Sequence, residues 1–115
     1  MLRLLTILSA LIFSSQASAG FYTGNELYSE CTARESSSTY YQSSSICSGY
    51  ISGVYDHFIG TAEKGLLCIG NNVTIGQTKK IFISYADRHP EKLHLPAWLL
   101  VENSIFLAFS CKKQN

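Results

Sequence analysis

The chain has 115 residues, a formal net charge of +1, 46% hydrophobic residues and 15% charged residues. This length suits a single domain, and the hydrophobic content excludes an intrinsically disordered chain. The near-neutral charge excludes a strongly basic nucleic-acid binder as well as an acidic tail, so we expect no nucleic-acid partner.

Residues 1–19 have the pattern of a secretory signal peptide. Arg3 precedes an apolar run, and a small-x-small cleavage pattern ends at Ala19. The apolar run is shorter than the about 20 residues that cross a bilayer, so an uncleaved membrane anchor is the less favoured alternative. We predict cleavage between Ala19 and Gly20, which leaves an exported domain over 20–115 with no membrane association.

The first predicted helix covers 23–34. Thr23 is followed three residues later by Glu26, which is the capping-box pattern that begins many helices. A serine-rich segment over 36–45 comes next and is predicted to be an exposed loop.

The second predicted helix covers 45–64 and is expected to be the central buried helix, because its apolar residues recur at i, i+3 and i+4. Gly49, Gly53 and Gly60 each cost about 1 kcal/mol relative to alanine inside a helix. Gly49 and Gly53 share a face, so we expect a neighbouring backbone to approach the helix there.

The third and fourth predicted helices cover 74–88 and 96–109. The third begins with a second capping box and ends before Pro90, since the residue before a proline is disfavoured in a helix. In the fourth, Pro96 occupies a favoured first position. Apolar residues surround this helix almost completely, so it is either largely buried or forms a contact surface. The predicted fold class is an all-α bundle of four helices.

Four cysteines follow the predicted cleavage site: Cys31, Cys47, Cys68 and Cys111. An even number in a short exported chain indicates two disulfides, and the lack of a C-x-x-C pair argues against zinc. Cys47 and Cys68 flank the second helix and would lie about 30 Å apart, whereas bonded cysteines need Cα atoms within about 7 Å. Antiparallel helix pairs favour Cys31–Cys47 and Cys68–Cys111. The alternative, Cys31–Cys68 with Cys47–Cys111, stays open.

We predict no catalytic or metal-binding group and no cofactor. Asp56 and His57 are consecutive in a predicted helix, so their side chains point about 100° apart and form no ready acid–base pair. His89 and His94 flank a turn, where histidines more often cap helices or bond the backbone than transfer protons or bind metals. A secreted hydrolase that uses these histidines remains the less favoured interpretation.

Two connecting segments are therefore candidate contact surfaces of a binding module. Tyr40 and Tyr41 lie in the serine-rich segment, and tyrosine is a frequent interface anchor. The other segment is the turn between the third and fourth helices. Its candidate partner-binding residues are His89, Pro90, Glu91, Lys92 and His94.

The ordered motifs resemble the Rap/Tai family of bacterial immunity proteins. They comprise FYTGNELYSEC, then CSGYISGVYDHF, then Cys68, then VTIGQTKKIFISYADRHPEKLHLPAWLLVENSIFLAFSC. Two positions depart from the family pattern. The family usually has proline near Cys68, where this chain has Ile69 and Gly70, and proline before the last cysteine, where this chain has Ser110.

The resemblance implies an all-α, disulfide-bonded periplasmic protein that is not an enzyme. Characterised members bind and block peptidoglycan amidase toxins delivered by type VI secretion systems, often as homodimers. The implied partner is therefore a peptidoglycan amidase effector. The alternative is an envelope structural or interaction protein, or a small lipid carrier, with no amidase partner.

Overall fold

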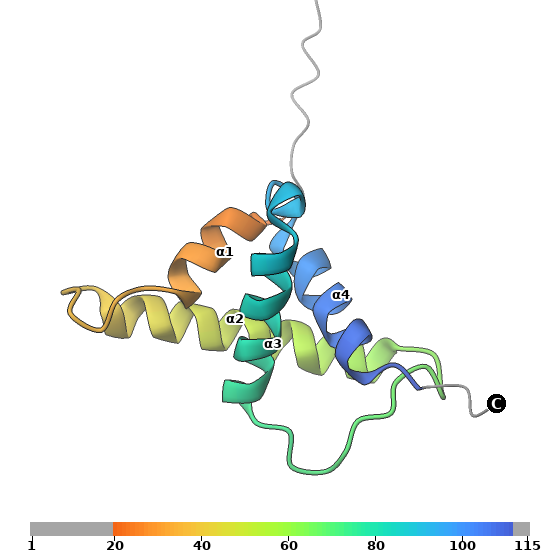
Figure 1. Cartoon of the computed structure of the whole chain (residues 1–115). Helices are drawn as coiled ribbons and strands as arrows, with labels where there is room; N and C mark the ends of the chain where they lie inside the picture. The colour runs from red at the N-terminus through yellow and green to blue at the C-terminus, as the bar shows by residue number, and fades with distance from the viewer. Residues whose placement is uncertain (1–19, 112–115) are drawn as a thin grey trace, which may run out of the picture.

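The computed structural model describes residues 20–111, so the predicted signal peptide lies outside the described residues. Its elements are α1 (Gly24–Cys31), α2 (Tyr40–Thr61), α3 (Ile75–Arg88), the 3-10 turn η1 (Pro90–Lys92) and α4 (Ala97–Phe109) (Figure 1). The predicted all-α fold of four helices is confirmed. Over 20–111, no helix is long and apolar enough to span a membrane.

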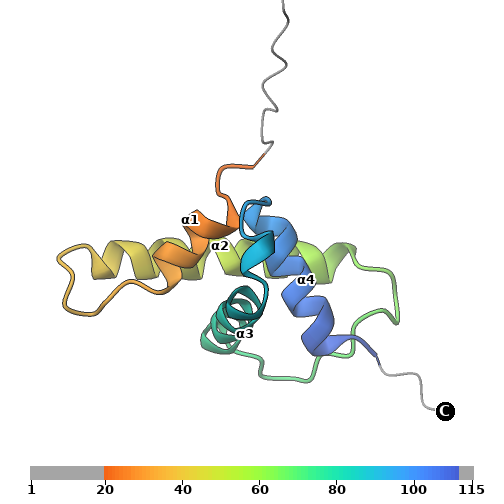
Figure 2. The same cartoon turned by 45° about the horizontal axis from the view of Figure 1, so that its top comes forward.

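The long helix α2 runs behind the other three helices in Figure 1. The tilted view in Figure 2 shows α1 lying along the first half of α2, with α3 and α4 crossing in front of it. One side of α2 is therefore covered by helices, and the other side is left open to solvent.

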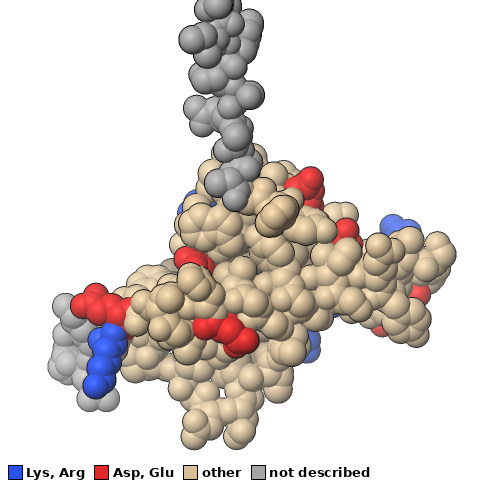
Figure 3. Space-filling model, turned by 180° about the vertical axis from the view of Figure 1, so that it is seen from behind, with Lys and Arg blue, Asp and Glu red and all other residues tan. Residues whose placement is uncertain are grey.

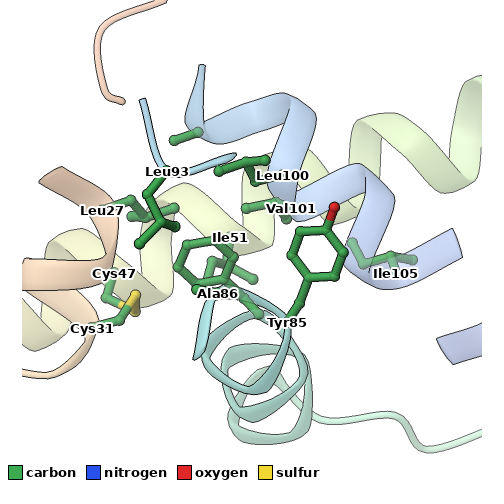
Figure 4. Packing of buried hydrophobic residues seen from close by; sticks show 12 residues of the cluster. Leu27, Cys31, Cys47, Ile51, Tyr85, Ala86, Leu93, Leu100, Val101 and Ile105 are labelled. Atoms are coloured by element: carbon green, nitrogen blue, oxygen red, sulfur yellow. A yellow bond between two sulfur atoms is a disulfide. The ribbon is translucent and has the colours of Figure 1, made fainter. Parts of the chain in front are cut away.

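The core lies where the four helices meet. Each helix contributes at least one fully buried apolar side chain, among them Leu27, Ile51, Phe82, Leu100 and Ile105. Figure 4 shows residues from α1, α2, α3 and α4 converging on this cluster, with Leu93 from the turn before α4 joining them. Burial of these side chains supplies the main favourable term for folding.

The two favoured disulfides are confirmed. Cys31 and Cys47 are bonded with Cα atoms 5.0 Å apart, and Cys68 and Cys111 with Cα atoms 4.8 Å apart. The first bond lies in the core and joins the end of α1 to α2 (Figure 4). The second joins the loop after α2 to the end of α4, where the Cys68 N–H also donates to the Phe109 carbonyl at 2.7 Å.

Both predicted capping boxes are present. The Glu26 N–H donates to Thr23 Oγ1 at 3.2 Å, and the Thr23 N–H donates to Glu26 Oε2 at 2.8 Å. At α3, Gln77 and Thr74 exchange equivalent bonds of 3.1 and 2.8 Å. These bonds satisfy amide groups that the first turn of a helix leaves without partners, which is why both starts were predictable.

Three boundaries differ from the prediction by three residues or more. The first helix ends at Cys31 and not at position 34, and α2 ends at Thr61 and not at position 64. At its other end, α2 begins at Tyr40, within the segment predicted as a loop. Serine costs only a few tenths of a kcal/mol in a helix. The helical bond from the Ser43 N–H to the Thr39 carbonyl, 2.9 Å long, therefore forms in spite of the serine-rich composition.

The second helix is central, as predicted, because it packs against α1, α3 and α4, but the prediction that it is mostly buried is wrong. Only Cys47 and Ile51 of α2 are fully buried. Among the described residues, a Cβ added to Gly49, Gly53 or Gly60 would meet no atom within 4 Å. These glycines therefore lie on the open side of α2, and no backbone approaches them.

Candidate partner-binding surface

The predicted turn between the third and fourth helices contains a short 3-10 helix. His89 is the C-cap residue that follows α3, and its N–H donates to the Ala86 carbonyl at 3.2 Å. The Lys92 N–H then donates to the His89 carbonyl at 3.0 Å, and the Leu95 N–H donates to the Lys92 carbonyl at 2.9 Å. Successive local bonds thus fold the segment on itself before α4 begins at Ala97.

The segment from α1 holds this turn in place through its backbone. The Gly24 N–H donates to the Leu95 carbonyl and the Asn25 N–H to the Leu93 carbonyl, each at 2.8 Å. The Ala97 N–H donates in return to the Tyr22 carbonyl at 2.9 Å. Because these three bonds tie the second half of the turn to residues 22–25, and local bonds connect its first half to α3, the backbone of the turn is fixed against the rest of the domain.

Gly24 permits this close contact. A Cβ at this position would lie 2.3 Å from Leu100 Cδ1 and 2.9 Å from the Leu93 carbonyl oxygen. No heavy side-chain atom fits there without a shift of the turn. The FYTGN motif of the sequence thus places a glycine where the start of α1 approaches the turn most closely among the glycine positions.

The outer surface of the turn carries the candidate side chains. Pro90, Glu91 and His94 are exposed, and Lys92 is partly exposed. The imidazole of His89 is held between elements: its ring centroid lies 4.4 Å from that of Tyr85, and its Nδ1 lies 3.3 Å from Glu91 Oε1.

The carboxyl of Glu91 is stabilised in its charged form. A hydrogen bond from its own backbone N–H lowers the pKa of Glu91 below its ordinary value, and the facing His89 ring adds to this effect. The turn therefore presents the Glu91 carboxylate together with the side chains of Lys92 and His94 on a fixed backbone.

The two tyrosines form a separate surface. Tyr40 and Tyr41 stand at the start of α2 with ring centroids 5.5 Å apart, and Tyr41 is 83% exposed. Figures 1 and 2 both place the start of α2 far from η1. The structure does not bring the two groups of candidate residues together, so one compact binding site does not contain both.

The residues considered for catalysis are also separated. Asp56 lines a small pocket with the start of α3, whereas His57 lines a different cleft with Trp98 and Glu102 of α4. Over residues 20–111, no group of three or more His, Cys, Asp or Glu side chains could hold a metal ion. Ser52 lines the pocket of Asp56, but its hydroxyl donates to the Ser48 carbonyl at 2.6 Å.

The surface of α4 was only partly anticipated by sequence. This helix buries one face, yet Trp98, Phe106 and Leu107 remain 41%, 38% and 61% exposed. A hollow flanks each side of it. The α2–α4 cleft, about 420 Å³, is lined by Gly53, Val54, His57, Trp98 and Glu102. The α3–α4 groove, about 430 Å³, is lined by Lys80, Ile81, Ser84, Arg88, Ser104, Leu107 and Ala108.

The open side of α2 carries little charge. Asp56 is the only Asp, Glu, Lys or Arg within Tyr40–Thr61. Figure 3 shows the molecule from this side, where a few acidic side chains stand on a surface that is largely uncharged. Because this surface carries few charges, it does not repel a neutral or apolar partner electrostatically.

Comparison with known proteins identifies a family. A family model described as Rap1a immunity proteins matches residues 23–111, which include both disulfides, the turn and all four helices. No curated protein and no solved structure matches the chain.

Proposed function

Because the chain belongs to the family of Rap1a immunity proteins, we propose that it binds and blocks a peptidoglycan amidase that a type VI secretion system delivers into the periplasm. Immunity proteins act as non-enzymatic inhibitors, so the function depends on a surface and needs no catalytic group. The proposal assigns that surface to the turn over residues 89–95, which would enter the active-site cleft of the amidase.

The fixed backbone of the turn is the observation that carries this proposal. Hydrogen bonds from Gly24 and Asn25 hold the carbonyls of Leu95 and Leu93, while Pro90, Glu91 and His94 stay exposed. A segment that is already ordered loses less conformational entropy on binding than a mobile loop does. An inhibitor that fills a cleft gains affinity in this way.

Action in the periplasm is supported by two features. Two disulfides persist in oxidising compartments and are rare in the cytosol. Residues 1–19 have the signal-peptide pattern, which would deliver the domain over 20–115 to that compartment.

A homodimer is part of the proposal. Trp98 and Phe106 of α4 are exposed next to the uncharged side of α2, and exposed apolar side chains of this size often mark an interface. Phe106→Glu should then convert a dimer into a monomer with unchanged helix content, measured by light scattering after gel filtration. A wild-type protein that is monomeric at micromolar concentration would contradict the dimer.

The direct test is protection of living cells. Bacteria that direct a type VI amidase effector to their own periplasm should survive when they also export this protein. The double variant Glu91→Arg/His94→Glu should lose protection, because it reverses the charge pattern of the exposed turn. Glu63→Arg changes an exposed carboxylate in the loop after α2 and should protect as the wild type does.

The outcomes separate the parts of the proposal. If exporting cells die as fast as cells without the protein across a panel of amidase effectors, the amidase assignment fails. If they survive and the turn variant protects equally well, the amidase assignment stands and the turn is the wrong surface.

A further inference from the structure

We propose that the α3–α4 groove is a second part of the partner-binding surface and that it takes an acidic segment of the partner protein carrying one apolar side chain. This inference rests on the proposed function, because the partner is the inhibited toxin. It adds a location and a chemistry that the turn alone does not provide.

The first argument is the area of the turn. A stable protein complex buries about 800 Å² on each partner and uses about 20–30 residues a side. The exposed side chains of the turn, chiefly Pro90, Glu91 and His94, form only a small part of such a surface. The interface must therefore extend onto a neighbouring element.

The second argument is continuity. Arg88 is the last residue of α3 and directly precedes His89, so the groove begins where the turn begins. Lys80, two helical turns earlier, lines the same groove about 12 Å away along the helix axis. A partner segment that leaves the turn can thus follow α3 without a gap.

The third argument is charge. Arg88 Nε donates to the Ser84 carbonyl at 3.2 Å, which orients the guanidinium and leaves its terminal nitrogens to other acceptors. Among the described residues the one ion pair is His89 with Glu91, so neither Lys80 nor Arg88 contacts a carboxylate there. Asp87, the acidic residue of α3, accepts a hydrogen bond from Tyr28 instead.

The fourth argument is the apolar wall. Leu107 is 61% exposed and Ala108 is exposed, and both line the groove opposite the cations. An occupant that matches the groove therefore combines carboxylates with an apolar side chain. An arginine fork binds a carboxylate through two parallel hydrogen bonds, so Arg88 provides the more directional contact and Lys80 a point charge.

A protein segment fits this surface better than an anionic membrane does. The groove is a shallow hollow between two helices, whereas a flat bilayer is met by protruding side chains. The net charge of the whole chain is only +1, which gives little general attraction to anionic lipids. Membrane binding is accordingly an outcome that would count against the proposal.

The test uses the oxidised protein labelled with ¹⁵N and three defined probes. The first is a helical peptide with two Glu side chains spaced eight residues apart and Leu between them. The second is the same peptide with Gln in place of Glu, and the third is a vesicle of phosphatidylglycerol. We expect the Glu peptide to shift the amide signals of the groove and to bind at least fivefold more tightly than the Gln peptide.

Variants locate the effect. Lys80→Gln/Arg88→Gln should weaken binding of the Glu peptide at least tenfold. Lys64→Gln removes an exposed cation in the loop after α2 and should leave binding unchanged. The proposal is overturned if the Glu and Gln peptides bind equally tightly, or if Lys64→Gln weakens binding of the Glu peptide as much as the groove double variant does. It is also overturned if neither peptide binds, or if only the vesicle binds.

The protection assay distinguishes this inference from the proposed function. If the groove double variant protects cells as well as the wild type while the turn variant does not, the groove proposal fails and the proposed function stands. If the wild type protects no cell, the proposed function fails, and the groove then loses its assigned partner whatever the peptide does.

Discussion

The phenol of Tyr28 on α1 donates a hydrogen bond to Asp87 on α3, and the Tyr28 hydroxyl oxygen lies 2.5 Å from Asp87 Oδ1. These residues are 59 positions apart in sequence, and their bond joins the first helix to the helix that precedes the turn. Together with the backbone bonds from Gly24 and Asn25 to the turn, it ties α1 to both sides of residues 89–95.

The Tyr28–Asp87 bond makes stability depend on pH in the alkaline range. The bond to Asp87, with burial as a lesser cause, raises the pKa of Tyr28 above its ordinary value of 10.0. The folded state therefore keeps the proton longer than the unfolded state does. The stabilisation is complete below pH 10 and is lost as pH rises through the folded-state pKa.

Tyr28→Phe should lower the unfolding temperature at pH 7 and reduce its further fall between pH 9 and 11. Circular dichroism melts at several pH values measure both effects. Tyr41→Phe removes the hydroxyl of an exposed tyrosine and is the control. If the unfolding temperature of Tyr28→Phe falls between pH 9 and 11 as steeply as that of the wild type, the bond does not contribute to the pH dependence of stability.

Glu91 should make stability depend on pH in the acid range, with the opposite sign: stability falls as the pH is lowered. Its own backbone N–H, and then His89, hold the pKa of Glu91 below the ordinary value of 4.5. Its contribution is therefore complete above pH 4.5 and is lost as pH falls through the lower folded-state pKa. Glu91→Gln should flatten the acid limb of a stability–pH curve, and Glu63→Gln should not. Identical acid limbs in all three proteins would contradict this assignment.

Replacing glycine by alanine should change the free energy of unfolding in opposite directions at two positions. Gly24→Ala places a Cβ against Leu100 and the Leu93 carbonyl and should destabilise the protein by about 1–3 kcal/mol. Gly49→Ala points into open space in α2 and should stabilise it by up to about 1 kcal/mol. Urea unfolding measures both. Equal changes in the two variants would mean that the contact between α1 and the turn is looser than described.

The two disulfides should differ in their reduction by a dithiol. Cys68 is exposed, whereas Cys47 is fully buried and Cys31 is 6% exposed in the core. Thiolate attack requires access to a sulfur atom, so the Cys68–Cys111 bond should open first in the folded protein. Alkylation followed by mass spectrometry identifies the order. Opening of the Cys31–Cys47 bond first, without unfolding, would contradict the burial of that bond.

Features that depend on a few neighbouring residues were predictable. The capping boxes at Thr23 and Thr74 are local hydrogen-bond patterns, and both helices begin where those patterns indicate. The length of the second helix excluded a Cys47–Cys68 bond, and antiparallel packing favoured the two bonds that are present, but only the structure decided against Cys31–Cys68 with Cys47–Cys111. The family resemblance carried the functional class, and the match over 23–111 confirms the family.

The errors arose where periodicity was used to infer burial. The apolar pattern of α2 was sufficient for a helix but did not show how many neighbours would cover it, and only Cys47 and Ile51 are fully buried. The start at Tyr40 was missed because serine composition is a weak signal against a helix.

The sequence by itself determined the number of helices, the presence of two disulfides and the immunity family, since these depend on local spacing, cysteine count and motif order. Only the tertiary structure decided which cysteines pair, that α1 holds the turn, that the tyrosine pair lies elsewhere, and that a cleft and a basic groove flank α4. Those features depend on how helices distant in sequence cross one another, and a one-dimensional pattern of apolar and polar residues does not encode the crossing.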